Sequence, residues 1–131
     1  MSRVQLALNV DDLEQAVAFY SRLFGAEPAK RKPGYANFAI ADPPLKLVLF
    51  EAPGATEKLN HLGVEVETTA EVTATQQRVE AEGLAAVDGS GVCCFAEQDK
   101  VWVEGAGERW EVYKVLADSE TFACAPDGCA S

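Results

Sequence analysis

The sequence predicts an α+β domain built from two consecutive βαβββ modules. Each half of the chain opens on a strand pattern in which apolar residues alternate with other residues. Each pattern is followed by a helix with a capping residue at its start and a glycine at its end. The same seven-residue spacing separates Gln5 from the cap at Asp12 and His61 from the cap at Thr68. A repeated module explains this agreement between the two halves.

The first module is expected over residues 1–52. Its opening strand, residues 4–10, leads to a helix that begins after Asp12, and Gln15 completes the spacing of a capping box. The helix carries apolar residues at helical spacing and is expected to stop at Gly25. Two further strands are predicted at residues 35–40 and 45–50.

The second module is expected over residues 57–117. Its first strand, residues 61–66, precedes a capping box formed by Thr68 and Glu71 and a weaker helix that ends at Gly83. Strands are predicted near residues 92–95, 101–104 and 110–115. Residues 1–117 are therefore expected to form a single domain, and residues 118–131 a mobile tail that contains cysteines.

The composition narrows the possible classes of function. A chain of 131 residues is one domain's worth of material. Its formal net charge of -10 argues against nucleic acid and against anionic membrane surfaces as partners. No stretch approaches the roughly 18 apolar residues of a membrane span. The first residues become acidic too early for a secretory signal, so we expect a cytoplasmic protein.

Polar residues open both modules. Gln5 and His61 lie on the strand face opposite to the face expected to pack against the helix. Pairing of the modules would place both residues on a concave sheet, where a buried polar side chain must be hydrogen-bonded or bound to a metal. Superposing the last strands of the two halves adds Lys46 and Glu111 as equivalent positions.

This layout resembles the vicinal oxygen chelate superfamily, which includes glyoxalase I, extradiol dioxygenases and fosfomycin-resistance proteins. The resemblance covers residues 1 to about 117 and implies a metal site at these four positions. Lys46 has no lone pair while protonated, which leaves Gln5, His61 and Glu111 as the expected metal ligands and catalytic residues. An amide oxygen, an imidazole and a carboxylate leave coordination positions open and are tolerable for Fe(II). The alternative is an ordinary core histidine beside an exposed strand glutamine.

Cys93 and Cys94 are adjacent and follow the glycine-rich segment 89–91. A disulfide between neighbours would be strained, because their Cα atoms are about 3.8 Å apart and a relaxed disulfide wants roughly 4.4–6.8 Å. In a regular strand the two side chains would point to opposite faces, whereas a bend would let both sulfurs converge on one atom. Soft thiolates select thiophilic centres, of which trivalent arsenic is one. The alternative is that both are small buried hydrophobic residues.

Residues 93–103 and 110–122, together with Gln5 and His61, closely resemble the organoarsenical C–As lyase family, whose relatives are often labelled cadmium-induced proteins. That resemblance implies Fe(II) as cofactor, O2 as co-substrate and arsenic binding by Cys93 and Cys94. It also implies cleavage of the carbon–arsenic bond of trivalent methyl or aromatic arsenicals with release of arsenite. Movement of the thiol loop between open and closed positions is a further implication.

Several alternatives remain open. The chain could sequester Cd(II) or arsenite through its thiols without chemistry, or act as a metal-dependent thiol transferase resembling fosfomycin-resistance proteins. Cys124 and Cys129 could pass arsenic to the loop, although we expect them to be dispensable tail thiols. The choice between alkyl and aryl substrates and between monomer and homodimer is also open.

Overall fold

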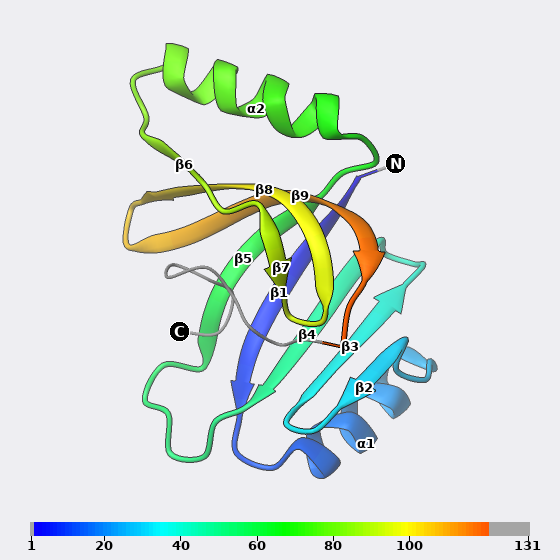
Figure 1. Cartoon of the computed structure of the whole chain (residues 1–131). Coiled ribbons are helices and arrows are strands. Elements are labelled where there is room, and N and C mark those ends of the chain that lie inside the picture. The colour runs from blue at the N-terminus through cyan, green and yellow to red at the C-terminus, as the bar shows by residue number, and fades with distance from the viewer. Residues whose placement is uncertain (1, 121–131) are drawn as a thin grey trace. The chain divides into compact units, whose positions relative to one another are not determined.

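The computed structural model describes residues 2–120, which form two compact units. The N-terminal unit comprises residues 3–60, and the C-terminal unit begins at His61. Cys124 and Cys129, which the sequence suggested as accessory thiols, lie outside the described residues. Each unit is a sheet that carries one helix (Figure 1).

The N-terminal unit contains β1 (Arg3–Val10), α1 (Leu13–Phe24), β2 (Lys30–Lys32), β3 (Tyr35–Ile40) and β4 (Leu45–Glu51). The strand order is β2-β3-β4-β1. β1 and β4 run parallel, and the other neighbours run antiparallel. α1 packs on one face of this sheet, where an apolar cluster of buried residues forms the core: Leu13, Val17, Ala36, Phe38, Ile40, Leu47 and Leu49.

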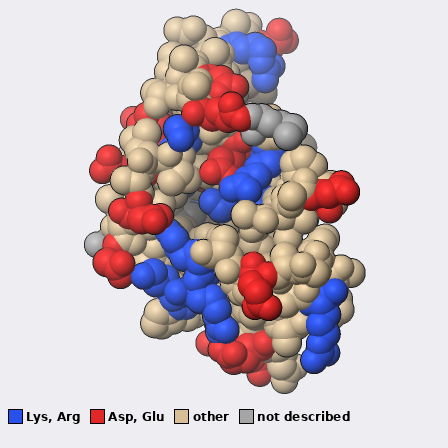
Figure 2. All heavy atoms as spheres, turned by 90° about the vertical axis from the view of Figure 1, so that its right-hand side faces the viewer, with Lys and Arg blue, Asp and Glu red and all other residues tan. Residues whose placement is uncertain are grey.

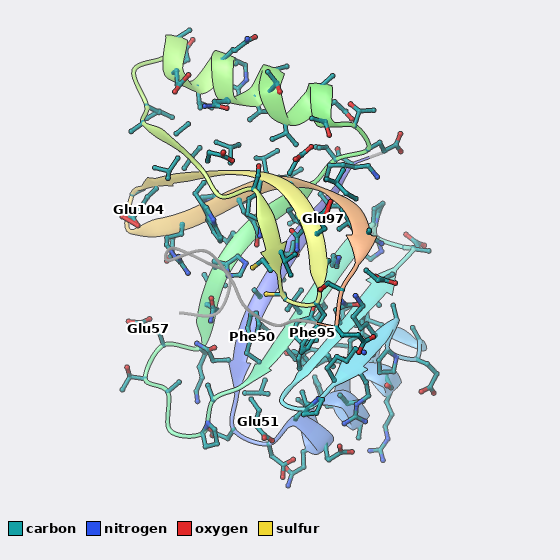
Figure 3. All side chains as sticks on the ribbon, viewed as in Figure 1. Phe50, Glu51, Glu57, Phe95, Glu97 and Glu104 are labelled. Atoms are coloured by element: carbon teal, nitrogen blue, oxygen red, sulfur yellow. The ribbon has the colours of Figure 1, made fainter. Side chains whose placement is uncertain are left out.

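Both ends of α1 follow the sequence prediction. The side chain of Asp12 accepts a 3.1 Å hydrogen bond from the backbone N–H of Gln15. Gly25 ends the helix at φ 63°, in the left-handed region that glycine adopts without a steric penalty. The backbone N–H of Leu13 donates to Glu51, which Figure 3 labels, so the start of α1 is tied to the end of β4.

The C-terminal unit contains β5 (Leu59–Glu65) from His61 onwards, followed by α2 (Thr69–Ala81), β6 (Ala86–Asp88), β7 (Gly91–Cys93), β8 (Ala96–Gly105) and β9 (Glu108–Asp118). The strand order is β5-β9-β8-β6, and β7 pairs with β8. β5 and β9 are parallel, whereas β8 is antiparallel to its neighbours. α2 lies across β8 and β9 (Figure 1) and buries Val72 and Val79. The predicted capping box of Thr68 and Glu71 is present.

Three features differ from the predicted strands. The strand expected near residues 92–95 ends at Cys93, because the chain turns at the next two residues. β8 and β9 are longer than expected, since they pair with each other along their length. The three-residue strands β2 and β6 were not predicted, because so short a segment shows no alternation of apolar residues.

The charge on the surface is unevenly distributed. Figure 2 shows Lys and Arg side chains in several separate groups, with Asp and Glu side chains among them, on the face turned to the viewer, although the chain carries a net charge of -10. β2 consists of three basic residues and is the last strand on its side of the sheet. Charged edge strands of this kind discourage pairing with a second sheet. None of the described helices is long and apolar enough to cross a membrane.

Candidate metal and thiol site

Alternate residues of β8 form a buried polar row on one face of the C-terminal unit. Gln98, Lys100 and Trp102 point to the same side of the strand, and each is less than 9% exposed. Figure 3 shows how β8 runs from Phe95, at the turn before it, past Glu97 to Glu104. Polar side chains buried in a row need partners, and those partners come from the neighbouring strands.

His61, Glu111 and Lys100 are brought together as a buried cluster. His61 lies on β5, Glu111 on β9 and Lys100 on β8. The Nε2 atom of His61 contacts the Oε2 atom of Glu111, and the ammonium group of Lys100 lies 2.7 Å from Oε1 of the same carboxylate. All three residues are at most 2% exposed. Glu111 thus uses one oxygen for each of its two neighbours.

The surroundings of Glu111 keep this carboxylate ionised. Burial alone would raise its pKa, because a charged group loses solvation in the protein interior. The contact with His61 and the positive charge of Lys100 act in the opposite direction and prevail, so the pKa falls from 4.5 to about 2. At neutral pH the carboxylate is therefore negatively charged and offers only acceptor oxygens.

Trp102 encloses this cluster. Its ring meets the ring of His61 edge to face, with the centroids 5.2 Å apart, and Lys100 Nζ lies 5.3 Å from its centroid. The Arg109 guanidinium lies 4.8 Å from the Trp102 ring. A hollow of about 260 Å³ adjoins Trp102 and is lined by Val87, Trp102, Val103, Glu104 and Arg109. Trp102 therefore contacts the cluster and also lines this hollow.

The two adjacent cysteines occupy a tight turn between β7 and β8. Cys93 is the last residue of β7, and Cys94 and Phe95 have φ angles of 52° and 66°. Two successive positive φ angles between paired strands are the signature of a type I′ hairpin turn, which usually contains asparagine and glycine. The backbone is strained there, and such strain clusters at functional sites.

This turn brings the two sulfur atoms together. Their separation is 3.5 Å, well beyond the roughly 2.05 Å of a disulfide bond. The bend that the sequence led us to expect at these residues is present, and the two side chains converge instead of pointing to opposite faces. Cys93 is 3% exposed and Cys94 is 8% exposed. The pair can therefore act as a bidentate soft ligand in a largely enclosed setting.

Gln5 lies in the N-terminal unit, on β1. It is 4% exposed and lies directly opposite Lys46 of β4 in the parallel pairing. Leu6, Leu8 and Val10 of the same strand pack against the apolar core, so Gln5 lies on the sheet face that α1 does not cover. Within this unit, Gln5 thus lies on the sheet face that the sequence predicted for it.

The residues that could hold a metal are of mixed type. Among residues 2–120, no group of three or more His, Cys, Asp or Glu side chains is placed to bind a metal ion. His61 and Glu111 supply two donor atoms that face each other, while Lys100 engages the second oxygen of Glu111. A glutamine amide oxygen is a ligand of another type that a metal ion can use.

The sequence analysis did not single out Lys100, Trp102 or Gln98. The signal that could have found them is the hairpin between β8 and β9, whose turn contains Ala106 and Gly107, both at positive φ. Counting back from that turn pairs Trp102 with Glu111. Lys100 is then the diagonal neighbour of Glu111, within reach of a long side chain.

Comparison with known proteins gives consistent results. Residues 3–104 match the Glyoxalase/Bleomycin resistance protein/Dioxygenase superfamily. The chain is 70% identical over 128 residues to the cadmium-induced protein CadI of Mycobacterium tuberculosis (strain ATCC 25618 / H37Rv), covering 96% of this chain and 84% of that protein. It is 58% identical over 130 residues to the trivalent organoarsenical cleaving enzyme of Thermomonospora curvata, covering 97% of this chain and 86% of the relative.

Solved structures agree on the fold. The crystal structure of the 2,3-dioxygenase LapB from Pseudomonas sp. KL28 matches with a TM-score of 0.69 at 20% identity, covering 95% of this chain and 46% of that chain. Methylmalonyl-CoA epimerase from Mycobacterium tuberculosis matches with a TM-score of 0.58 at 14% identity, covering 86% of each chain. At these identities the similarity concerns the fold alone, and it confirms the predicted fold class.

Proposed function

The chain belongs to the Glyoxalase/Bleomycin resistance protein/Dioxygenase superfamily, and from this premise we propose that it is an enzyme that cleaves the carbon–arsenic bond of trivalent organoarsenicals. The proposed substrates are methylarsenite and trivalent aromatic arsenicals, and the proposed product is arsenite. Relatives named trivalent organoarsenical cleaving enzyme at 58% and 36% identity support the proposal.

The spacing of the two sulfur atoms is the main observation in support of the proposed activity. The two sulfur atoms are 3.5 Å apart. An atom bound to both at about 2.3 Å, the length of a zinc–thiolate bond, would therefore have an S–atom–S angle of about 100°. Trivalent arsenic is pyramidal and accepts angles near this value. A monoalkyl or monoaryl arsenical has two exchangeable hydroxyl groups, so two thiols hold the arsenic and its carbon substituent remains available.

The proposed metal is Fe(II), held by Gln5, His61 and Glu111. The donor types fit, because a buried imidazole nitrogen of His61 and a carboxylate oxygen of Glu111 lie next to each other while Lys100 engages the other carboxylate oxygen. Gln5 is the third ligand in this proposal, and its amide oxygen completes a set of one neutral oxygen, one imidazole and one carboxylate. Fe(II) bound there would supply a centre with open positions that can activate O2.

The chain's own residues have distinct tasks in this proposal. Cys93 and Cys94 exchange with the two hydroxyl groups on arsenic, and each thiol proton leaves with a hydroxyl group as water. Burial of the two cysteines excludes bulk water from the complex. Lys100 holds Glu111 in one orientation, and Trp102 packs against His61, so both proposed ligands are preorganised.

The test loads the full-length protein with Fe(II) without oxygen, adds methylarsenite and then O2, and measures arsenic species by chromatography with mass detection. We expect arsenite to appear only with both Fe(II) and O2. Glu111→Gln should keep arsenical binding and lose cleavage, because it removes a proposed metal ligand and leaves Cys93 and Cys94 in place. Absence of O2-dependent arsenite from the iron-loaded protein would remove the proposed activity.

Matched double variants distinguish the role of the cysteines in the turn from the role of the cysteines in residues 118–131. The double variant Cys93→Ser/Cys94→Ser should lose both binding and cleavage, because hydroxyl groups are not soft ligands. The control is Cys124→Ser/Cys129→Ser, which removes the same number of thiols and should leave cleavage unchanged. Equal losses in the two double variants would contradict the role proposed for the turn.

A second candidate function is sequestration of Cd(II) or arsenite by the thiols without chemistry. The observation that favours it is the name of the relatives at 70% identity, cadmium-induced protein CadI. Sequestration needs the cysteine pair but gives no role to a buried His61–Glu111 pair. The same experiment decides between them, because a sequestering protein would bind methylarsenite and return it unchanged in air.

A further inference from the structure

The side-chain amide of Gln98 anchors the cysteine turn. Its Nε2 atom donates a 2.8 Å hydrogen bond to the backbone oxygen of Cys93. A carbonyl oxygen can only accept, so the nitrogen of the amide must face it, and this settles which way the amide is turned. The other end of the amide, Oε1, consequently faces away from that carbonyl.

Gln98 Oε1 is a buried acceptor that lacks a donor. Gln98 is 7% exposed, and within residues 2–120 no group donates a hydrogen bond to its Oε1 atom. Buried polar atoms in native proteins almost always have a partner, because an unmade bond retains the full cost of desolvation. An acceptor left over beside the two thiols is therefore available to a donor on a bound ligand.

The position of Gln98 near the start of β8 keeps this acceptor close to the turn. The register between β8 and β9 shifts between Glu97 and Gln98, and such bulges redirect side chains next to functional sites. The dimensions of an amide place Oε1 within about 5 Å of the Cys93 backbone oxygen. Gln98 also shares its strand face with Lys100, which holds Glu111. Gln98 thus stands between the cysteine turn and Lys100 in the order of residues along β8.

We infer that Gln98 Oε1 accepts a hydrogen bond from a hydroxyl group that stays on arsenic while Cys93 and Cys94 hold it. Gln98 is then a positioning residue with a second role, because it selects arsenic that still carries oxygen. This inference rests on the proposed function, since it requires an arsenical at the two thiols.

The chemistry of exchange decides which arsenicals present that hydroxyl group. Arsenite, As(OH)3, loses two hydroxyl groups as water to two thiol protons, forms two As–S bonds and keeps one hydroxyl group. Methylarsenite has only two hydroxyl groups and keeps none once both thiols are bound. The hydrogen bond to Gln98 is therefore available to bound arsenite, the proposed product, and absent from the fully bound substrate.

The test measures binding and requires no turnover. Iron-free protein without oxygen is dialysed to equilibrium against arsenite or methylarsenite, and bound arsenic is measured by elemental mass spectrometry. Gln98→Met keeps the length of the side chain and removes both polar atoms. We expect its arsenite Kd to rise about five-fold more than its methylarsenite Kd, the effect of one neutral hydrogen bond. Gln77→Met, on the exposed side of α2, is the matched control and should change neither Kd.

The ratio of the arsenite Kd to the methylarsenite Kd distinguishes the effect of losing Nε2 from the effect of losing Oε1. Loss of the Nε2 contact loosens the turn and lowers the affinity for both arsenicals alike. Loss of Oε1 lowers the affinity for arsenite alone. Gln98→Glu retains an acceptor, so it should keep the wild-type ratio even if both affinities fall. An unchanged ratio in Gln98→Met, or equal ratios in the two variants, overturns the role of Gln98 and leaves the proposed function standing. Wild-type protein that binds neither arsenical overturns both.

Discussion

Lys100 and Glu111 form a buried ion pair in which the ammonium nitrogen lies 2.7 Å from Oε1 of the carboxylate. Each residue is 2% exposed. Taking both charges out of water is costly, and their attraction offsets that cost only while both are present. Because Glu111 also contacts His61, the lysine compensates a charge that the proposed metal site needs.

Lys100→Met should destabilise the metal-free protein by about 3 kcal/mol, because it leaves a buried carboxylate without its cation. The measurement is urea unfolding at neutral pH. Lys58→Met is the matched control, since Lys58 and Asp11 lie 3.4 Å apart on the surface, where screened pairs contribute little. A similar loss of unfolding free energy in the two variants would show that the buried ion pair contributes no more to stability than the exposed pair.

Acid should destabilise the metal-free protein through Glu111. Its folded pKa of about 2 lies below the ordinary 4.5, so the unfolded chain binds the proton more readily. The stabilisation is complete above pH 4.5 and is lost as the pH falls towards 2. Urea midpoints measured across this range should fall less steeply in Glu111→Gln than in the wild type. Glu97→Gln, at an exposed position of β8, should keep the wild-type slope, and a wild-type slope in Glu111→Gln would refute the assignment.

Local signals in the sequence predicted the helices and the long strands well. The caps at Asp12 and Thr68 and the stop at Gly25 depend only on nearby residues, and each is observed. The predicted strand 35–40 coincides with β3 (Tyr35–Ile40). Such signals are readable because capping and alternation are set within a few residues.

Features that depend on pairing between strands were not predictable in the same way. β2 and β6 are strands only because β3 and β8 pair with them. The comparison of the two halves treated Lys46 and Glu111 as equivalent, yet Gln5 lies opposite Lys46 whereas Gly63, and not His61, lies opposite Glu111. The register of each parallel pair is a tertiary property, so the repeat in the sequence could not specify it.

Cys94 should tolerate glycine better than alanine. At φ 52° a Cβ atom is unfavourable, so Cys94→Gly should be more stable than Cys94→Ala by about 1 kcal/mol, against the usual order. Cys93 is the matched control, because it ends a regular strand. There the usual order should hold, with Cys93→Ala the more stable variant. Thermal unfolding of the four variants measures both differences, and the same order at both positions would contradict the turn.

Gly89→Ala should disturb His61 through Trp102. A Cβ atom at Gly89 would lie 2.6 Å from Cδ1 and 2.7 Å from Nε1 of the Trp102 ring, closer than packed atoms approach. The buried ring must move, at a cost of about 1–3 kcal/mol, and its edge-to-face contact with His61 changes with it.

Urea unfolding and tryptophan fluorescence should therefore both change in Gly89→Ala, and the affinity for Fe(II) should fall because a proposed ligand loses its support. Gly105→Ala is the matched control on β8, since a Cβ atom there meets nothing within 4 Å. If Gly89→Ala binds Fe(II) as Gly105→Ala does, while its fluorescence shows that the ring has moved, Trp102 does not position His61. If neither property changes, a Cβ atom at position 89 does not displace the Trp102 ring.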